Sequence, residues 1–77
     1  MRRVKVDSTS ILSIGYNVSK RELEVEFRAS GHVYRYFDVE PEEHAEFIAA
    51  ESKGTYLNQV FKSREHRFIA IKKKQSH

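Results

Sequence analysis

The chain has 77 residues, no cysteine and a formal net charge of +3, which together describe one small domain. A chain of this length buries only about 60–65% of its unfolded surface, so its core contributes little net stability. The lack of cysteine excludes a disulfide framework and a thiolate zinc site and favours a reducing compartment. No apolar run exceeds four residues, and the basic start is not followed by the apolar stretch of a signal peptide. We therefore expect an unprocessed, soluble, cytoplasmic protein without cofactor, metal or membrane partner.

The charge is unevenly distributed along the chain. Residues 38–51 contain six acidic and no basic residues, whereas residues 62–77 contain six basic residues and one acidic residue. A basic segment of this kind is able to contact phosphates, although in most small domains it only adds solubility. We expect a single domain over residues 1–77, with its core at about 4–63 and a basic tail at 64–77.

Three segments have the alternation that is typical of strands. Apolar and polar side chains alternate with period two over residues 10–16 and 22–29, and residues 32–39 have a similar content of aromatic and β-branched side chains. Turn-forming residues at 17–20 and 30–31 separate these segments. The pattern predicts an antiparallel meander of three strands.

The periodicity changes at Pro41, which suits the first turn of a helix. Residues 41–52 are predicted to form this helix, which Gly54 would end in the left-handed conformation. Thr55 would then cap a second helix over residues 56–63, where apolar side chains recur at helical spacing.

The order of elements is therefore β-β-β-α-α, which predicts an α+β fold: a three-stranded antiparallel meander with two helices packed on one face. The tail from about Arg64 is expected to be less ordered than the rest. Within it, residues 68–71 are apolar and would either add a short C-terminal fourth strand or pack on the outer face of the sheet, over Val33 and Phe37.

The turns set which residues lie opposite each other. A two-residue turn at 30–31 keeps Arg35 outside, whereas a three-residue loop would bury it without a partner at a cost of several kcal/mol. We therefore expect a two-residue turn. The pairs that follow from it and from the turn at 17–20 are Phe27–Tyr34, Val25–Tyr36, Glu26–Arg35, Ile14–Leu23 and Leu12–Val25.

This register assigns the two faces of the sheet. The face that receives the helices is expected to contain Leu12, Ile14, Tyr16, Leu23, Val25, Phe27, Tyr34 and Tyr36. The opposite face is expected to contain Ser13, Gly15, Glu22, Glu24, Glu26, Arg28, Val33, Arg35 and Phe37. Three glutamates along the central strand would repel phosphates, so an RNA-recognition surface on that outer face is excluded. The two neighbouring tyrosines are interpreted as core residues.

Five short motifs occur in an order that resembles a known family. They are VDSTSILSIGY at 6–16, LEVEF at 23–27, the pair Tyr34 and Tyr36, Val39 with a nearby proline, and Ala50-x-Ser52-x-Gly54-x-Tyr56-Leu57-Asn58. The chain resembles the KTSC domain family, a small module named after the C-terminal extension of some lysyl-tRNA synthetases and also found as small bacterial and phage proteins. It departs from the family pattern at His44, where an aromatic residue is usual. The synthetase context of this resemblance implies RNA binding.

Catalysis is not expected from this sequence. The four histidines show neither metal-ligand spacing nor a carboxylate placed for general-base chemistry. The serines and threonine at 8–10 and Ser52 lack the surroundings of a nucleophile elbow, and turn or cap roles account for them. We expect a binding module and not an enzyme.

Two binding hypotheses follow. In the first, a basic groove at the start and exposed side of the second helix, continuing into the tail, binds RNA; its residues are Lys53, Gly54, Thr55, Asn58, Lys62, Arg64 and Arg67. In the second, a protein partner docks on the sheet face with Val33, Arg35 and Phe37, or on the acidic first helix. The structural alternative for the groove residues is a helix cap and a solvated helix face.

Overall fold

The computed structural model describes residues 2–72. Its strands are β1 (Arg3–Lys5), β2 (Ile11–Asn17), β3 (Glu22–Phe27), β4 (Val33–Tyr36) and β5 (Phe68–Lys72). Its helices are α1 (Pro41–Ala49) and α2 (Lys53–Tyr56), and α2 continues through a π-helical turn (Leu57–Phe61) and a 3₁₀ turn (Lys62–Arg64). We refer to residues 53–64 together as the second helical segment.

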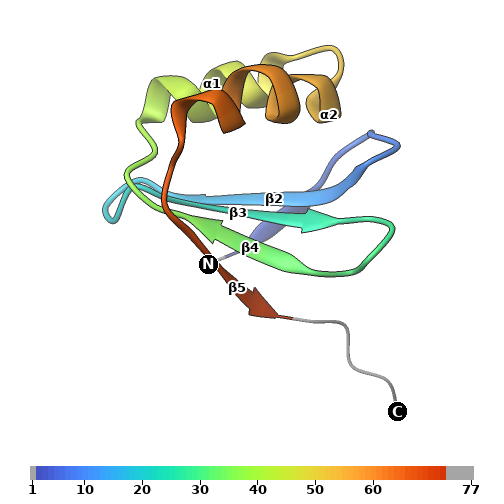
Figure 1. Cartoon of the computed structure of the whole chain (residues 1–77), viewed down its shortest axis with the longest axis horizontal. Coiled ribbons are helices and arrows are strands. Elements are labelled where there is room, and N and C mark those ends of the chain that lie inside the picture. The colour runs from blue at the N-terminus through green and yellow to red at the C-terminus, as the bar shows by residue number, and fades with distance from the viewer. Residues whose placement is uncertain (1, 73–77) are drawn as a thin grey trace.

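The five strands form one antiparallel sheet in chain order, β1-β2-β3-β4-β5. Figure 1 shows α1 and the second helical segment on one face of this sheet, with β5 leading away from the helices. The predicted α+β class, with an antiparallel sheet and two helical segments, is confirmed. The predicted strand number is wrong, because the sheet has five strands and not three with a possible fourth.

The two additional strands lie at the edges of the sheet. β1 has only three residues and its apolar side chain, Val4, is 64% exposed, so it lacks the alternation that marks a half-buried strand. β5 forms over the apolar segment for which a strand was one of two alternatives, and it places Phe68 opposite Tyr36. Of the two alternatives for this apolar segment of the tail, the strand is the one that the structure has, and residues 73–77 lie outside the described part of the chain.

Both hairpins have longer turns than expected. The turn between β3 and β4 has four residues, 28–31, and Gly31 takes a positive φ of 74° that favours glycine. The turn between β2 and β3 also has four residues, 18–21, whereas the expected pair Ile14–Leu23 required two. The observed pairs are Val25–Tyr34, Leu23–Tyr36, Glu24–Arg35, Ile14–Val25 and Tyr16–Leu23. The expected partners were thus wrong by two residues, yet the assignment to faces survives because an even shift keeps each side chain on its face.

A bulge in β2 changes the side-chain alternation before Ser13. Ile11 is fully buried and Leu12 is only half-buried, so Leu12 does not occupy the core position expected for it. The core cluster between sheet and helices consists of Ile11, Ile14, Leu23, Val25, Tyr36, Val39, Phe47, Leu57 and Phe61. Of the two tyrosines predicted as core, Tyr36 is 4% exposed and Tyr34 is half-buried.

The outer face of the sheet is organised around one buried carboxylate. Glu24 is 2% exposed and accepts hydrogen bonds from Arg3 Nη1 at 2.8 Å and from Arg35 Nη2 at 2.7 Å. Gly15 lies between Arg3 and Glu24 in the cross-strand row, and a Cβ there would lie 2.9 Å from the Cγ of Arg3. Glycine is therefore needed for β1 to pack this closely.

The helix boundaries follow local capping. A capping box between Glu40 and Glu43 starts α1 in front of Pro41. The helix ends at Ala49, so Gly54 is not its C-terminal cap; Gly54 lies inside α2, where a Cβ would be 3.0 Å from Ser10 Oγ.

The N-terminal cap of α2 is Ser52 and not Thr55. The Ser52 Oγ accepts a hydrogen bond from the Thr55 backbone amide at 3.3 Å. Because Gly54 packs against Ser10, the second helical segment begins close to residues 8–10, which lead into β2.

Candidate functional site: an aromatic groove between the sheet and the second helical segment

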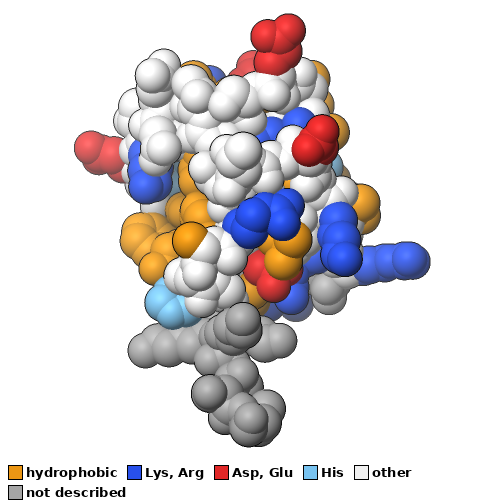
Figure 2. Space-filling model, turned by 90° about the vertical axis from the view of Figure 1, so that its right-hand side faces the viewer, with side chains coloured by type: hydrophobic (Ala, Val, Ile, Leu, Met, Phe, Trp, Pro, Cys, Tyr) orange, Lys and Arg blue, Asp and Glu red, His pale blue; other side chains and the backbone are white. Residues whose placement is uncertain are grey.

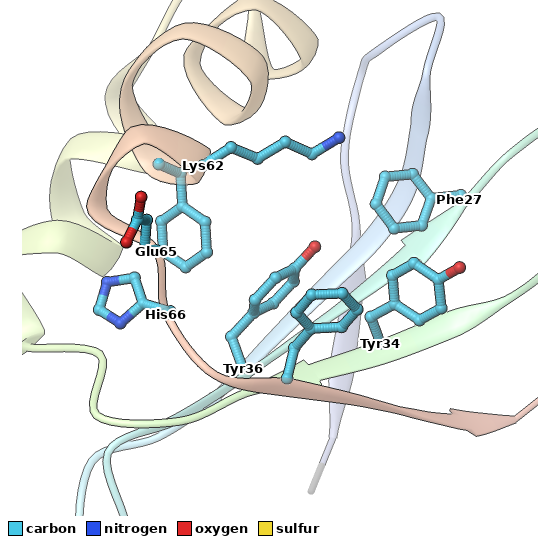
Figure 3. A pocket seen from close by; sticks show the side chains of 8 residues that line it. Phe27, Tyr34, Tyr36, Lys62, Glu65 and His66 are labelled. Carbon is cyan, nitrogen blue, oxygen red and sulfur yellow. The ribbon is translucent and has the colours of Figure 1, made fainter.

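Two adjoining cavities lie between the sheet and the second helical segment. Their volumes are about 390 and 450 Å³, and Phe27, Tyr34 and Lys62 line both of them. We call the continuous depression the aromatic groove and define it by the residues Phe27, Tyr34, Tyr36, Phe61, Lys62 and Phe68. Figure 3 shows Phe27, Tyr34 and Tyr36 projecting from the strands towards Lys62, which extends from the helical segment.

The floor of the groove is a connected set of rings. The ring centroids of Phe27 and Tyr34 are 5.4 Å apart, those of Tyr34 and Phe68 are 5.4 Å apart, and those of Tyr36 and Phe68 are 5.3 Å apart. Phe68 remains 53% exposed although it is a large apolar side chain. In Figure 2, hydrophobic side chains gather on the left of the view, with a basic side chain directly above them. Exposed rings in a hollow mark a surface on which a flat apolar group can bind.

Two polar groups face the middle of the groove, whereas Glu65 and His66 line one end of it. Figure 3 shows Lys62 extending across it and the Tyr36 hydroxyl directed into the space below that side chain. Within residues 2–72, no ion pair or hydrogen bond engages the Lys62 ammonium, and none engages the Tyr36 hydroxyl. Burial raises the pKa of Tyr36 to about 12, so its hydroxyl stays protonated at neutral pH.

The end of the groove near His66 is fixed by a cluster of polar contacts. His66 stacks on Phe61 with the ring centroids 4.7 Å apart. Its Nε2 lies 2.8 Å from the Glu43 carboxylate and its Nδ1 lies 3.0 Å from the backbone oxygen of Phe37. Arg64 Nη1 donates to the same Glu43 carboxylate at 2.8 Å. This cluster ties the chain that leads into β5 to α1.

The carboxylate at the centre of this cluster is stabilised in its charged form. Burial alone would raise the pKa of Glu43, but hydrogen bonds from Arg64 and His66 outweigh burial and lower it. Glu43 is thus a carboxylate partner of His66, a contact that the sequence did not indicate. Both ring nitrogens of His66 face acceptors, so neither is free to act as a general base.

The basic residues proposed from the sequence do not share one groove. Lys62 lines the aromatic groove. Arg64 is paired with Glu43 and lies 3.5 Å from Glu46, both on α1. The guanidinium of Arg67 lies 4.7 Å from the centre of the Phe37 ring.

The remaining proposed residues surround the start of α2. Lys53 donates to the backbone oxygen of Ala50 at 3.1 Å and borders a polar cavity of about 220 Å³ that also contacts Asp7 and Glu51. Two carboxylates beside this cavity disfavour a phosphate there. Gly54 packs against Ser10, Thr55 hydrogen bonds with Ser52, and Asn58 is exposed.

The surfaces considered for a protein partner are largely engaged within the chain. Val33 is fully buried, Arg35 is hydrogen bonded to Glu24, and Phe37 lies beneath Arg67. On α1, Glu43 and Glu46 face Arg64.

A second apolar hollow of about 510 Å³ lies between the N-terminal strands and α1. Val4, Val18 and Ile48 line it and are 64%, 58% and 42% exposed. Tyr16 and His44 stack on each other there, with their centroids 4.5 Å apart, so His44 fills an aromatic position. This hollow presents aliphatic groups and not open ring faces.

Neither a metal centre nor a membrane-spanning helix is found among the residues that the structure describes. No three His, Cys, Asp or Glu side chains within residues 2–72 are grouped so that they could hold a metal ion. No helix in that range is long and apolar enough to cross a membrane.

Comparisons with known proteins identify similar chains. The sequence profile of the KTSC domain matches residues 7–64. An uncharacterized protein of Stutzerimonas stutzeri is 44% identical over 71 residues, which cover 92% of this chain and 99% of that protein. A protein of Tsukamurella paurometabola is 36% identical over 59 residues, which cover 77% of this chain and 87% of that protein.

The crystal structure of a KTSC domain protein from Yersinia pestis has a TM-score of 0.85 to this structure. It is 38% identical in sequence, and the match covers 92% of this chain and 97% of that one. The resemblance that the sequence motifs suggested is thereby confirmed at the level of the domain family, whereas no comparison bears on the link to lysyl-tRNA synthetases.

Proposed function

This chain belongs to the KTSC domain family, and we propose that it is a non-catalytic module that binds single-stranded RNA in its aromatic groove. In this proposal, bases stack on the rings of Phe68, Tyr34 and Phe27, and the Lys62 ammonium contacts a backbone phosphate. The observation that carries the proposal is the half-exposed ring of Phe68 beside Tyr34, in a groove that the Lys62 ammonium crosses without an ion pair or hydrogen bond to any of residues 2–72.

Base stacking explains why rings would be left open on the surface. Stacking of one base on an aromatic side chain contributes about 1–3 kcal/mol and tolerates different bases, because every base has a flat face. The groove combines several rings with a nearby cation, which is the arrangement that single-strand binding requires.

A single strand fits this groove better than a duplex does. Bases in a duplex are already stacked on each other and present only their edges, so they are not available to Phe68 or Tyr34. The charge available in the groove also favours a short contact, because Lys62 is the one basic side chain among the lining residues given above. We therefore place RNA binding in the aromatic groove and not along the basic helix and tail that the sequence suggested.

A protein partner is the alternative occupant of the groove. An apolar peptide would also bury Phe68, but it would not need the Lys62 ammonium. The outer sheet face and α1 give that alternative less support, because Arg35, Glu43 and Glu46 already have partners within the chain.

The test is a fluorescence anisotropy titration with labelled ten-nucleotide RNA of mixed, unstructured sequence at low salt. Phe68→Ala should remove roughly the stacking energy of one base, which corresponds to an affinity about 5- to 150-fold lower. The matched control is Val18→Ala. It shortens an apolar side chain of similar exposure that lines the second hollow, so it should leave the affinity unchanged. A hairpin RNA of equal length should bind more weakly than the single strand.

The proposal fails if the folded wild-type protein does not bind the single-stranded RNA at low salt. It also fails if Phe68→Ala and Val18→Ala lower the affinity equally, since the groove would then have no special role. Circular dichroism and urea unfolding of both variants separate a loss of binding from a loss of folding.

A further inference from the structure

The inner part of the aromatic groove contains hydrogen-bond donors and few acceptors. The Lys62 ammonium offers three donors and no acceptor, and the Tyr36 hydroxyl offers a donor that no described residue accepts. The hydroxyl belongs to a ring that is only 4% exposed and that packs edge-on against Phe61 at 4.9 Å, so its position is fixed. A ligand that binds here must bring acceptors.

The other polar groups that line the groove do not change this balance. Both nitrogens of His66 are taken by Glu43 and by the backbone oxygen of Phe37. Glu65 is exposed, and Figure 3 shows its carboxylate at the His66 end, directed away from Tyr36. The Tyr34 hydroxyl points away from Lys62 in the same view.

We infer that the groove prefers uracil and guanine, which carry a carbonyl oxygen at O4 and O6, over cytosine and adenine, which carry an amino group at the same positions, N4 and N6. The inference rests on the proposed RNA binding and names which strands the same site would select. A stacked uracil or guanine can place this carbonyl oxygen between the Tyr36 hydroxyl and one N–H of the Lys62 ammonium, whose other two donors remain for the backbone phosphate. An amino group in that position would meet the ammonium, which cannot accept a hydrogen bond, and only the phenol oxygen could receive it.

The expected preference is modest because the contact is small. One or two hydrogen bonds of ordinary strength correspond to a roughly three- to tenfold difference in affinity. The high pKa of Tyr36 supports the inference, since the hydroxyl keeps its proton throughout the usual range of pH.

The experiment compares labelled decamers of uridine, adenosine and cytidine and an alternating guanosine–uridine decamer. The wild-type protein should bind the uridine and guanosine–uridine strands about three- to tenfold more tightly than the other two. Tyr36→Phe keeps the ring and removes only the hydroxyl, so it should lower the affinity for uridine and leave the affinity for adenosine nearly unchanged. Tyr56→Phe is the matched control, because it removes a hydroxyl that donates to Glu46 outside the groove, and it should keep the preference.

A second variant tests the contribution of the Lys62 ammonium. Because Lys62 is exposed, Lys62→Met should reduce the preference for uridine without unfolding the protein. Equal affinity of the wild-type protein for all four strands would overturn the inference and leave the proposed function standing. A uridine preference that persists in both Tyr36→Phe and Lys62→Met would overturn it as well. If the wild-type protein binds none of the strands, the proposed function itself fails.

Discussion

On the outer face of the sheet, the buried Glu24 is held between Arg3 and Arg35, whereas in the aromatic groove the Lys62 ammonium has no ionic partner among residues 2–72. The outer face thus has more charged groups, but Arg3 and Arg35 are paired with Glu24. Among the described residues that line the groove, Lys62 is the basic side chain that remains available to a ligand. Pairing, and not the number of charges, therefore decides which surface of this domain can bind an anion.

The outer face should respond to mutation mainly through stability. Glu24→Gln leaves Arg3 and Arg35 without their shared carboxylate, and removal of one partner from a buried ion pair costs about 3 kcal/mol. Urea unfolding should show this loss. Glu26→Gln is the control, because Glu26 is only half-buried and accepts a hydrogen bond from Ser13 Oγ at 2.7 Å. Equal effects of the two substitutions would contradict a special role for Glu24.

Gly15→Ala tests whether β1 depends on close packing in the same network. The new Cβ would lie 2.9 Å from the backbone oxygen of Arg2 and 2.9 Å from Arg3 Cγ, so β1 must shift. Overpacking of this kind costs about 1–3 kcal/mol. Hydrogen exchange should show faster exchange in residues 3–5 while β3 and β4 stay protected. Unchanged protection of β1 would show that the strand has room for the methyl group.

The Glu43 cluster joins α1 to the chain that leads into β5 at one end of the groove, and its strength should depend on pH. The pKa of Glu43 is lowered in the folded state, so its contribution is complete at neutral pH and is lost as the pH falls through the folded-state value. Glu43→Gln should cost about 1–2 kcal/mol at pH 7. The difference between wild type and variant should shrink towards zero below about pH 4. Urea unfolding at several pH values measures it, and a difference that stays constant down to acid pH would refute this assignment.

The sequence predicted the faces of the sheet better than it predicted the contacts. Tyr36 was placed on the helix side correctly, because the hairpin shift of two residues preserves the face. The partner of Arg35 was missed, since four-residue turns replaced the two-residue turn on which the register was built. Turn length is set by local backbone conformation, such as the positive φ of Gly31, which alternation of side chains does not encode.

The candidate site was harder to predict, because it depends on contacts between distant parts of the chain. Phe68 lies beside Tyr34 only because β5 pairs with β4, and the sequence left that pairing open. Arg64 was expected to bind a ligand, but α1 provides Glu43 within 2.8 Å of it. The separate acidic and basic segments did hint at such pairing, since opposite charges in a small domain often meet.

Lys62 and Arg64 offer the most direct test of the claim that the aromatic groove binds RNA, because they are two residues apart and differ in pairing. The measurement is the affinity for a single-stranded uridine decamer as a function of salt, with Lys62→Gln compared with Arg64→Gln. If the groove binds RNA, Lys62→Gln should weaken binding and should make the slope of log affinity against log salt shallower by about 0.7. Arg64→Gln should leave both quantities nearly unchanged once the folded fraction is matched. The opposite result, in which Arg64→Gln weakens binding and Lys62→Gln does not, would contradict the account and return the RNA site to the basic helix and tail.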